Sequence, residues 1–336
     1  MNNLITMQTL GTTGQWGNQI FQYAYVRTFA KRHGCNYAVP SWGGQYLFGH
    51  EDPHVDKFPA LPRIVEHYSQ IEWNQCYGIP SPPTQEEQLD HDFYGWGQYH
   101  TSWYAPDKEF IQGLYDVVSP ERERVAPALA NLGGMGKTLI VFHLRRSDAG
   151  REIYFLTPVT WFLKWLHEHW RDYDDPVLYI STETPELAGY FRHYHPVVME
   201  DLGLEPAAVP PGYIYPYGDR FNDLRQLDFF PDWYVMQHAD VIVASDSTFS
   251  FSAAWTSRED QKYYRARLST QRFELVDPWD GDVSWREHLN DYPGIPGTQM
   301  DENPTYGDHW KNHSAKFPSV QLDQEEIEYW IEKSKP

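Results

Sequence analysis

The stretch TLIVFHLRRSD, residues 138–148, joins an uninterrupted apolar run to a pair of arginines. Apolar runs of this length are typical of parallel strands that helices cover on both faces. Arg145 and Arg146 therefore stand at the carboxyl end of a predicted strand, the edge at which open α/β sheets bind their ligands. We predict an α/β fold with a ligand site at this edge.

Helices and strands alternate on both sides of this strand, as expected for an α/β chain. Upstream, a predicted strand over 3–10 leads through a glycine-containing loop into a predicted helix over 19–33, with Gly34 placed as its C-cap. The other predicted elements are helices near 119–131 and over 157–170, 185–194, 232–239 and 320–333, and strands over 177–180 and 240–245. Residues 40–110 are rich in proline, so we expect only loops and short elements there.

The chain has 336 residues, which corresponds to about two domains of average size. We predict a Rossmann-like N-terminal lobe over 1–135 and a second lobe, which carries the arginine pair, over 136–275. Residues 276–336 form an acidic, aromatic-rich extension that ends in the final predicted helix.

Composition excludes several classes of protein. The chain has 27 Lys and Arg against 47 Asp and Glu, a net charge of −20, so we expect no nucleic-acid partner. Two cysteines are too few for a disulfide framework and lack the spacing of a zinc site. We find neither a signal-peptide pattern nor an apolar run long enough for a membrane span, so we expect a cytoplasmic protein. The oligomeric state stays open.

Two glycine-rich segments do not fit known cofactor motifs. NLGGMGKT (131–138) has Asn131 where a P-loop needs its first glycine, and it precedes a strand instead of linking strand to helix. GTTGQWG (11–17) spaces its glycines three apart, unlike the dinucleotide-binding fingerprint. Histidines spaced by two residues on predicted helices diverge and are not placed to share a metal. We predict neither a cofactor nor a metal.

The arginine pair has two interpretations. Two adjacent guanidiniums offer planar sets of donors that match phosphate oxygens, and they keep their charge at every physiological pH. At a strand end of an acidic chain, they indicate a diphosphate site. Alternatively, Arg145 and Arg146 form surface salt bridges, with Asp148 neutralising one of them.

Two other predicted strands also end in polar residues. SDSTFSFSAAW (245–255) follows the strand over 240–245, and its hydroxyls and helix N-terminus are suited to an anion, although the same pattern makes an ordinary N-cap. STETP (181–185) follows the strand over 177–180. Its Glu183 could accept the paired donor edge of a guanine, or it is simply the first turn of the next helix.

Three motifs together resemble a known family. GQWGNQIFQYA (14–24), HLRRSD (143–148) and SDSTFSFSAAW (245–255) are similar, in this order, to segments of the α-1,2-fucosyltransferases of glycosyltransferase family 11. The HxRRxD pattern is shared with α-1,6- and protein O-fucosyltransferases. The resemblance covers roughly residues 8–260. It implies a GT-B-like fold with two Rossmann-like lobes that face a central cleft, with GDP-fucose in the second lobe and the acceptor mainly on the first.

The resemblance also implies roles for particular residues. Arg145 and Arg146 would bind the diphosphate, and Asn18 would approach the β-phosphate and the fucose from the opposite lobe. The residues implied to bind or line the donor site are Gly14, Gly17, Gln19, His143, Glu183, Ser245, Ser247, Thr248 and Phe249. The chain departs from the family pattern at several positions, which include Asp246 in place of Asn.

The implied reaction is transfer of fucose from GDP-fucose, with inversion, to a glycan hydroxyl, most simply α-1,2 to a galactoside. Fixed guanidiniums would stabilise the leaving phosphate without a metal. Asp148 is either the base for the acceptor hydroxyl or an anchor for Arg145, and Glu152 is an alternative base. Acceptor stacking is assigned to aromatic residues that would otherwise be core residues: Trp96, Tyr99, Trp103 and Tyr104.

Two other functions remain open at this stage. The HxRRxD motif does not separate the α-1,2 linkage from an α-1,6 or O-linked one. An aromatic-rich sugar-binding protein with a degenerate transferase site would also explain an aromatic content of 16%. Turnover of GDP-fucose distinguishes an enzyme from such a binder.

Overall fold

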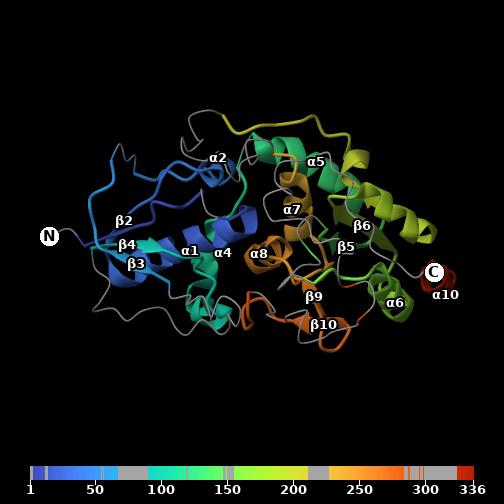
Figure 1. Cartoon of the computed structure of the whole chain (residues 1–336). Coiled ribbons are helices and arrows are strands. Elements are labelled where there is room, and N and C mark those ends of the chain that lie inside the picture. The colour runs from blue at the N-terminus through green and yellow to red at the C-terminus, as the bar shows by residue number, and fades with distance from the viewer. Residues whose placement is uncertain are drawn as a thin grey trace, which may run out of the picture.

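Two sheets that are mainly parallel build the molecule (Figure 1). The computed structural model describes residues 3–11, 14–53, 55, 57–66, 90–118, 120–146, 149, 155–210, 227–283, 287, 295, 298 and 324–336. Sheet A has the strand order β2-β1-β4-β3 and sheet B the order β10-β9-β8-β5-β6-β7. All pairings are parallel except that of β9 with β10. The predicted α/β class with two Rossmann-like sheets is thereby confirmed.

The strands of sheet A are short and those at the centre of sheet B are long. Sheet A comprises β1 (Leu4–Thr6), β2 (Asn36–Ala38), β3 (Arg63–Val65) and β4 (His91–Tyr94). Sheet B comprises β5 (Thr138–Leu144), β6 (Pro176–Thr182), β7 (Val197–Val198), β8 (Val241–Ala244), β9 (Lys262–Arg267) and β10 (Arg272–Val276). The central strand β5 is buried along almost its whole length, as its apolar sequence predicts.

Helices connect and cover these strands. The α-helices are α1 (Trp16–His33), α2 (Gly43–Phe48), α4 (Lys108–Gly113), α5 (Glu121–Gly133), α6 (Val159–His169), α7 (Phe230–Gln237), α8 (Thr248–Thr256) and α10 (Gln324–Lys333). The 3-10 helices are η2 (Thr101–Trp103), η3 (Ala105–Asp107), η4 (Trp170–Asp172), η5 (Pro185–Tyr194) and η6 (Met199–Leu202).

Helix α1 lies between the two sheets and joins their cores. Every residue from Gln19 to Val26 is buried, so the helix has no solvent-facing stripe over these two turns. Its Phe21 ring stacks on Trp255 of α8, with ring centroids 4.6 Å apart. One continuous apolar cluster therefore runs from Ile5 of sheet A to Tyr263 of sheet B.

Most predicted elements are confirmed, with some corrected bounds. The strand over 138–144 coincides with β5, and Gly34 caps α1 in the left-handed conformation, with φ of 59°. The strand predicted over 3–10 is wrong in length, because β1 ends at Thr6. The α-helix predicted over 185–194 is a 3-10 helix with a kink at Phe191. The domain boundary at residue 135 stays a prediction, although α5 precedes it and packs against α7 and β5.

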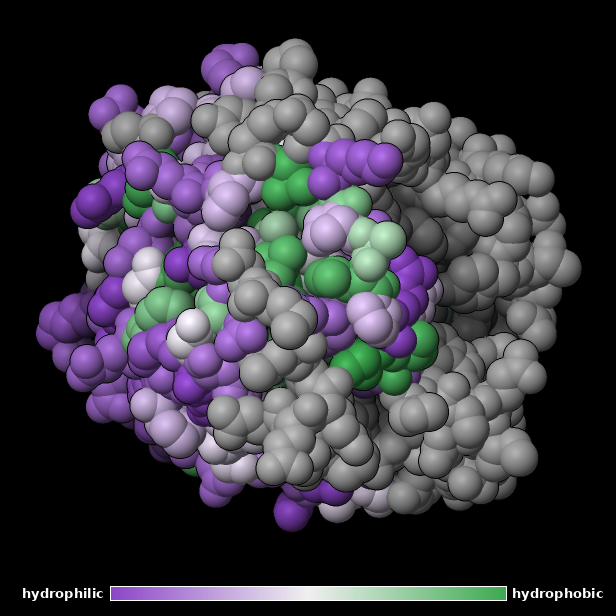
Figure 2. All heavy atoms as spheres, turned by 90° about the vertical axis from the view of Figure 1, so that its left-hand side faces the viewer, coloured by the Kyte–Doolittle hydropathy of each residue, from purple (hydrophilic) through white to green (hydrophobic). Residues whose placement is uncertain are grey.

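The end of the molecule at sheet A has a mixed surface, in which hydrophilic residues surround smaller hydrophobic areas (Figure 2). On this sheet, Val65 of β3 and its register partner Tyr94 of β4 are both exposed. No helix in the described part of the chain is long and apolar enough to cross a membrane.

The C-terminal helix α10 covers α6 and η5 on the far side of sheet B (Figure 1). Ile327 and Ile331 are each 1% exposed and belong to a second apolar cluster, which includes Phe162 and Leu166 of α6. Glu326 pairs with Lys164 at 3.1 Å. The helix is therefore held mainly by apolar burial, because a partly exposed ion pair adds little.

We expect Ile327→Ala to lower the free energy of unfolding by about 2–5 kcal/mol, because it leaves a cavity under α10. Urea unfolding measures the change. Tyr329→Ala on the same helix is the matched control, since its side chain is 54% exposed and should cost less than about 1 kcal/mol. Equal losses for both variants would contradict this account of α10.

Candidate functional site

The site lies where the chain leaves neighbouring strands of sheet B in opposite directions. After β5 the chain passes to β6 on one side, and after β8 it passes to β9 on the other. A crevice opens at such a switch point, outside the carboxyl ends of the strands. His143 pairs in register with Ala244, so Arg145 and Ser245 emerge side by side at this point.

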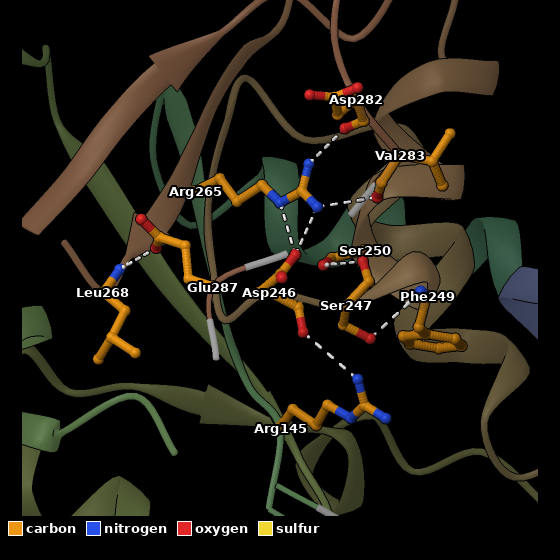
Figure 3. Close-up of polar contacts among 10 residues, drawn as sticks. All are labelled: Arg145, Asp246, Ser247, Phe249, Ser250, Arg265, Leu268, Asp282, Val283 and Glu287. Carbon is orange, nitrogen blue, oxygen red and sulfur yellow. Dashed lines mark hydrogen bonds and ion pairs between the residues drawn. The ribbon is translucent and has the colours of Figure 1, made fainter. Parts of the chain in front are cut away.

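Arg145 is fixed by the loop that follows β8. Its backbone N–H donates to the Oγ of Ser245 at 3.3 Å, and its Nη1 donates to the carbonyl oxygen of Asp246 at 3.3 Å. Figure 3 shows the Arg145 guanidinium directed at Asp246, beside Ser247 and Phe249 of the α8 N-terminus. The structure thus brings together the arginine motif and the hydroxyl cluster that the sequence places more than a hundred residues apart.

Arg146 is buried, 8% exposed, and its charge faces neutral oxygens. Its Nη1 donates to the carbonyls of Arg145 and Thr157, at 3.0 and 3.2 Å. Its backbone N–H donates to Glu183 at 3.1 Å, which brings the predicted Glu183 to the same edge. Burial lowers the pKa of Arg146 to about 10 against the opposing effect of Glu183, so the guanidinium stays charged at neutral pH.

Helix α8 directs its N-terminus at this edge. Ser247 is its N-cap and accepts a hydrogen bond from the backbone N–H of Phe249 at 3.2 Å. The first turn contains no acidic residue, so the positive end of the helix dipole is not neutralised there. Thr248 and Phe249, both predicted to line the donor site, are partly exposed at this end.

The N-terminus of α1 meets α8 at Gly17. A Cβ on Gly17 would lie 2.5 Å from the backbone carbon and oxygen of Thr248 and 2.6 Å from the nitrogen of Phe249. Only glycine permits this approach between two backbones. The first turn of α1 also lacks an acidic residue and has no side-chain cap. Two helix N-termini and two arginines therefore gather positive potential in a chain of net charge −20.

The glycine loop before α1 completes this side of the site. Gly14 has φ of +74°, and a Cβ there would lie 2.4 Å from the ring of Trp96 and 2.5 Å from the Asn18 amide. Gln19 donates to the Gly14 carbonyl at 3.2 Å, and Gln98 donates to Asn18 Oδ1 at 2.6 Å. The loop after β1 and the segment after β4 thus pack together at the carboxyl ends of these neighbouring strands.

His143 is the next-to-last residue of β5 and is 4% exposed. Its ring lies 5.5 Å from that of Phe249. Burial, together with the charges of Arg145 and Arg146, lowers its pKa from 6.5 to about 3. The imidazole is therefore neutral under physiological conditions and packs behind the arginines.

The four aromatic residues assigned to the acceptor do not have equal access to solvent. Tyr99 and Tyr104 are 2% and 0% exposed, and the Tyr104 hydroxyl donates to the Gly97 carbonyl. Stacking on a sugar needs an exposed ring face, so these two residues belong to the core instead. Trp103 is partly exposed but lies under the Arg32 guanidinium, 4.2 Å from the ring centroid. Trp96, whose ring lies beside Gly14, is partly exposed, so its role in stacking on the acceptor stays a prediction.

Asp148 and Glu152, the two predicted bases, lie outside the described residues, and so does Ser147. Their roles stay predictions.

Two buried charged residues behind the site, Arg265 and Asp232, were not predicted from the sequence. Arg265 of β9 is 0% exposed and pairs with Asp246. Asp232, in the first turn of α7, accepts hydrogen bonds from Tyr179 and from Ser181 of β6, and burial raises its pKa to about 7. The pattern KYYRAR (262–267) could have indicated Arg265. In a strand, Arg265 lies on the same face as Tyr263, and an arginine that faces the core needs a charged or polar partner.

Comparison with known proteins finds a likeness only among solved structures. No protein-family model matches the chain, and no curated protein matches it. NodZ, an α-1,6-fucosyltransferase soaked with GDP-fucose, is 12% identical, with 82% of this chain and 99% of that chain covered at a TM-score of 0.47. A mutant of Arabidopsis thaliana FUT1 in complex with GDP is 10% identical, with 84% and 74% covered at a TM-score of 0.47. The fucosyltransferase NodZ from Bradyrhizobium gives 12% identity, with 83% and 99% covered, at 0.44.

We expect the stability of the protein to fall between pH 7.5 and 5.0, in part because of His143. The unfolded chain protonates this side chain below pH 6.5, whereas the folded chain does so only near pH 3. Stability is then lost as the pH falls below 6.5, by about 1.4 kcal/mol per pH unit between pH 6.5 and 5.0.

His143→Gln should therefore reduce the loss between pH 7.5 and 5.0 by about 2 kcal/mol in urea unfolding. His167→Gln is the control, because this histidine is exposed on α6 and should leave the loss unchanged. A variant with the same pH dependence as the wild type would show that folding does not lower the pKa of His143.

Gly17→Ala should destabilise the fold by about 1–3 kcal/mol, because the added methyl group meets the backbone of α8. Thermal or urea unfolding measures the change. Gly133→Ala is the matched control, since a Cβ there has no neighbour within 4 Å and a helical alanine is tolerated. A stability like that of the wild type for Gly17→Ala would mean that the two helices do not approach as described.

Proposed function

We propose that the protein is a GDP-fucose-dependent fucosyltransferase. The observation that supports this most directly is the convergence of Arg145 and Arg146 with the acid-free N-termini of α1 and α8. This arrangement suits a diphosphate, because a diphosphate can engage guanidiniums and helix N-termini at the same time. Guanosine and fucose are indicated by the sequence motifs alone.

In this reaction the site would have to stabilise the leaving group, which is GDP. An oxygen of the acceptor forms a bond to the anomeric carbon as the bond from that carbon to the β-phosphate oxygen breaks. The acceptor proton passes to a base or to solvent, and GDP leaves with the bonding electron pair. Negative charge therefore grows on the β-phosphate, where Arg145 and the α8 dipole would act.

Burial strengthens this effect. Arg146 lies in a low-dielectric environment, where its charge interacts more strongly than at the surface, and His143 behind it stays neutral. The guanidiniums are positioned before the substrate binds, because backbone carbonyls already hold them. Fixed charges of this kind need no reorganisation during the reaction.

The proposal extends to the glycosidic linkage that is formed and to the acceptor sugar. We propose α-1,2 transfer to a galactoside, because the NQIFQYA and STFSFSAAW segments favour that class over other fucosyltransferases. Asn18 would approach the β-phosphate and the fucose from α1. Trp96 would stack on the acceptor, since it borders the glycine loop and is partly exposed. Asp148 would serve as base or anchor, with Glu152 as the alternative base.

Arg145→Ala should weaken GDP binding at least tenfold in a calorimetric titration without added metal, because the guanidinium would be lost from the diphosphate. Turnover of GDP-fucose should fall by roughly 10²-fold. Arg272→Ala on the edge strand β10 is the control: its side chain is 73% exposed, and GDP binding should stay within twofold of the wild type.

Two results would overturn the proposal. If the wild-type protein does not bind GDP, the site is not a GDP-sugar site. If it binds GDP but transfers no fucose to any of a panel of galactosides and other glycans, the degenerate sugar-binding protein becomes the better description.

A further inference from the structure

Arg265 is an arginine enclosed entirely by protein. It lies on β9, in register with Ala244 at the end of β8, and is 0% exposed. Its Nε donates to Oδ1 of Asp246 at 2.8 Å, and its Nη2 contacts the same oxygen. It also donates to two backbone carbonyls, from Nη1 to Asp282 at 2.7 Å and from Nη2 to Val283 at 2.8 Å (Figure 3).

Stability alone does not account for this arrangement. Removing two opposite charges from water costs several kcal/mol for each ion, and apolar residues of similar volume often serve a core equally well. The informative feature is what the guanidinium connects. It bonds to two segments that are separate in sequence, and each segment leads to a different half of the candidate site.

The first segment contains Asp246. Its carboxylate is held by Arg265, while its carbonyl accepts from Nη1 of Arg145 (Figure 3). The next residue, Ser247, is the N-cap of α8. Arg265 therefore fixes the residue that orients Arg145 and starts α8.

The second segment returns to sheet A. Gly281, just before Asp282, donates its N–H to Thr101 Oγ1 at 3.0 Å, and the Thr101 N–H donates to the Gly281 carbonyl at 2.9 Å. Thr101 is 0% exposed and opens η2, three residues after Gln98, which donates to Asn18. Arg265 is thereby linked through Thr101 to the side of the site that carries Asn18.

We propose that Arg265 is a positioning residue that holds the Arg145 side and the Asn18 side of the donor site in register. The inference rests on the proposed function, because it concerns the binding of the GDP-sugar at this site. Arg265 touches neither ligand nor reacting atoms and acts through Asp246 on one side and through Asp282 and Val283 on the other.

The test is a double-mutant cycle on GDP binding, measured by calorimetry. Removing Arg265 alone would leave the Asp246 charge buried, so the cycle uses Asp246→Asn as its reference, since asparagine keeps the acceptor oxygen. Adding Arg265→Gln to this reference should weaken GDP binding at least fivefold. In an Arg145→Ala background, the same change should cost only about twofold, because the group that Arg265 positions on one side is gone and only the link to the Asn18 side remains.

Amide hydrogen exchange distinguishes the loss of the links made by Arg265 from a general destabilisation of the fold. In the Asp246→Asn, Arg265→Gln protein, the amides of Thr101 and Gly281 should exchange at least tenfold faster than in the reference. The amide of Val141 in the centre of β5 is the control and should keep its rate relative to global unfolding. A uniform rise at all three amides, or equal GDP losses with and without Arg145, would overturn the proposal.

Thr101→Val is a second variant, which keeps both buried charges and removes only the hydroxyl link. We expect faster exchange at the Gly281 amide and a loss of GDP affinity of at least twofold that persists without Arg145. An unchanged affinity would overturn the link to the Asn18 side.

Failure of the proposed function and failure of the positioning role of Arg265 give different results. A wild-type protein that does not bind GDP overturns the proposed function, and the positioning role with it. A wild type that binds GDP through Arg145, combined with an additive cycle, overturns the role of Arg265 alone.

Discussion

The close approach of α1 and α8 at Gly17 is the contact on which the rest of the site depends. It brings two helix N-termini within van der Waals distance, so their positive ends add in one place. Neither first turn contains an acidic residue, and the carboxylate of Asp246, which precedes the N-cap of α8, is paired with Arg265. Arg145 and Arg146 add to the same positive potential. A bound anion would therefore find favourable interactions at this place.

Apolar packing between the sheets offsets the repulsion between the two helix ends. Phe21 stacks on Trp255 directly behind the helix N-termini, and Trp255 in turn lies 5.1 Å from Trp279. Apolar burial of this extent is worth far more than the repulsion between partial charges at helix ends. The aromatic content that stood out in the sequence therefore serves mainly the interior between the sheets. Of the aromatic residues predicted to stack on an acceptor, only Trp96, which borders the glycine loop, is left as a candidate, and its role stays a prediction.

The sequence predicted best the features that depend on local patterning. The strand up to Leu144 was placed correctly, because a strand covered on both faces is apolar at every position. β9 was missed, since its charged residues hide the alternation, and with it Arg265, whose partner is distant in the chain. The burial of Tyr104 could not be foreseen, because tertiary packing decides which face of a short element is covered. The kinked 3-10 helix from Pro185 has an amphipathic pattern like that of an α-helix.

The burial of residues 19–26 of α1 also bears on how the protein folds and diversifies. A helix that is enclosed on all sides over these residues belongs to neither sheet alone, and cutting the chain between the sheets would leave Phe21 and its neighbours in water. The two halves should therefore fold as one cooperative unit, without a stable half-molecule. For the same reason, recombination that exchanges one half for that of another protein would succeed only when the surface facing α1 is exchanged with it.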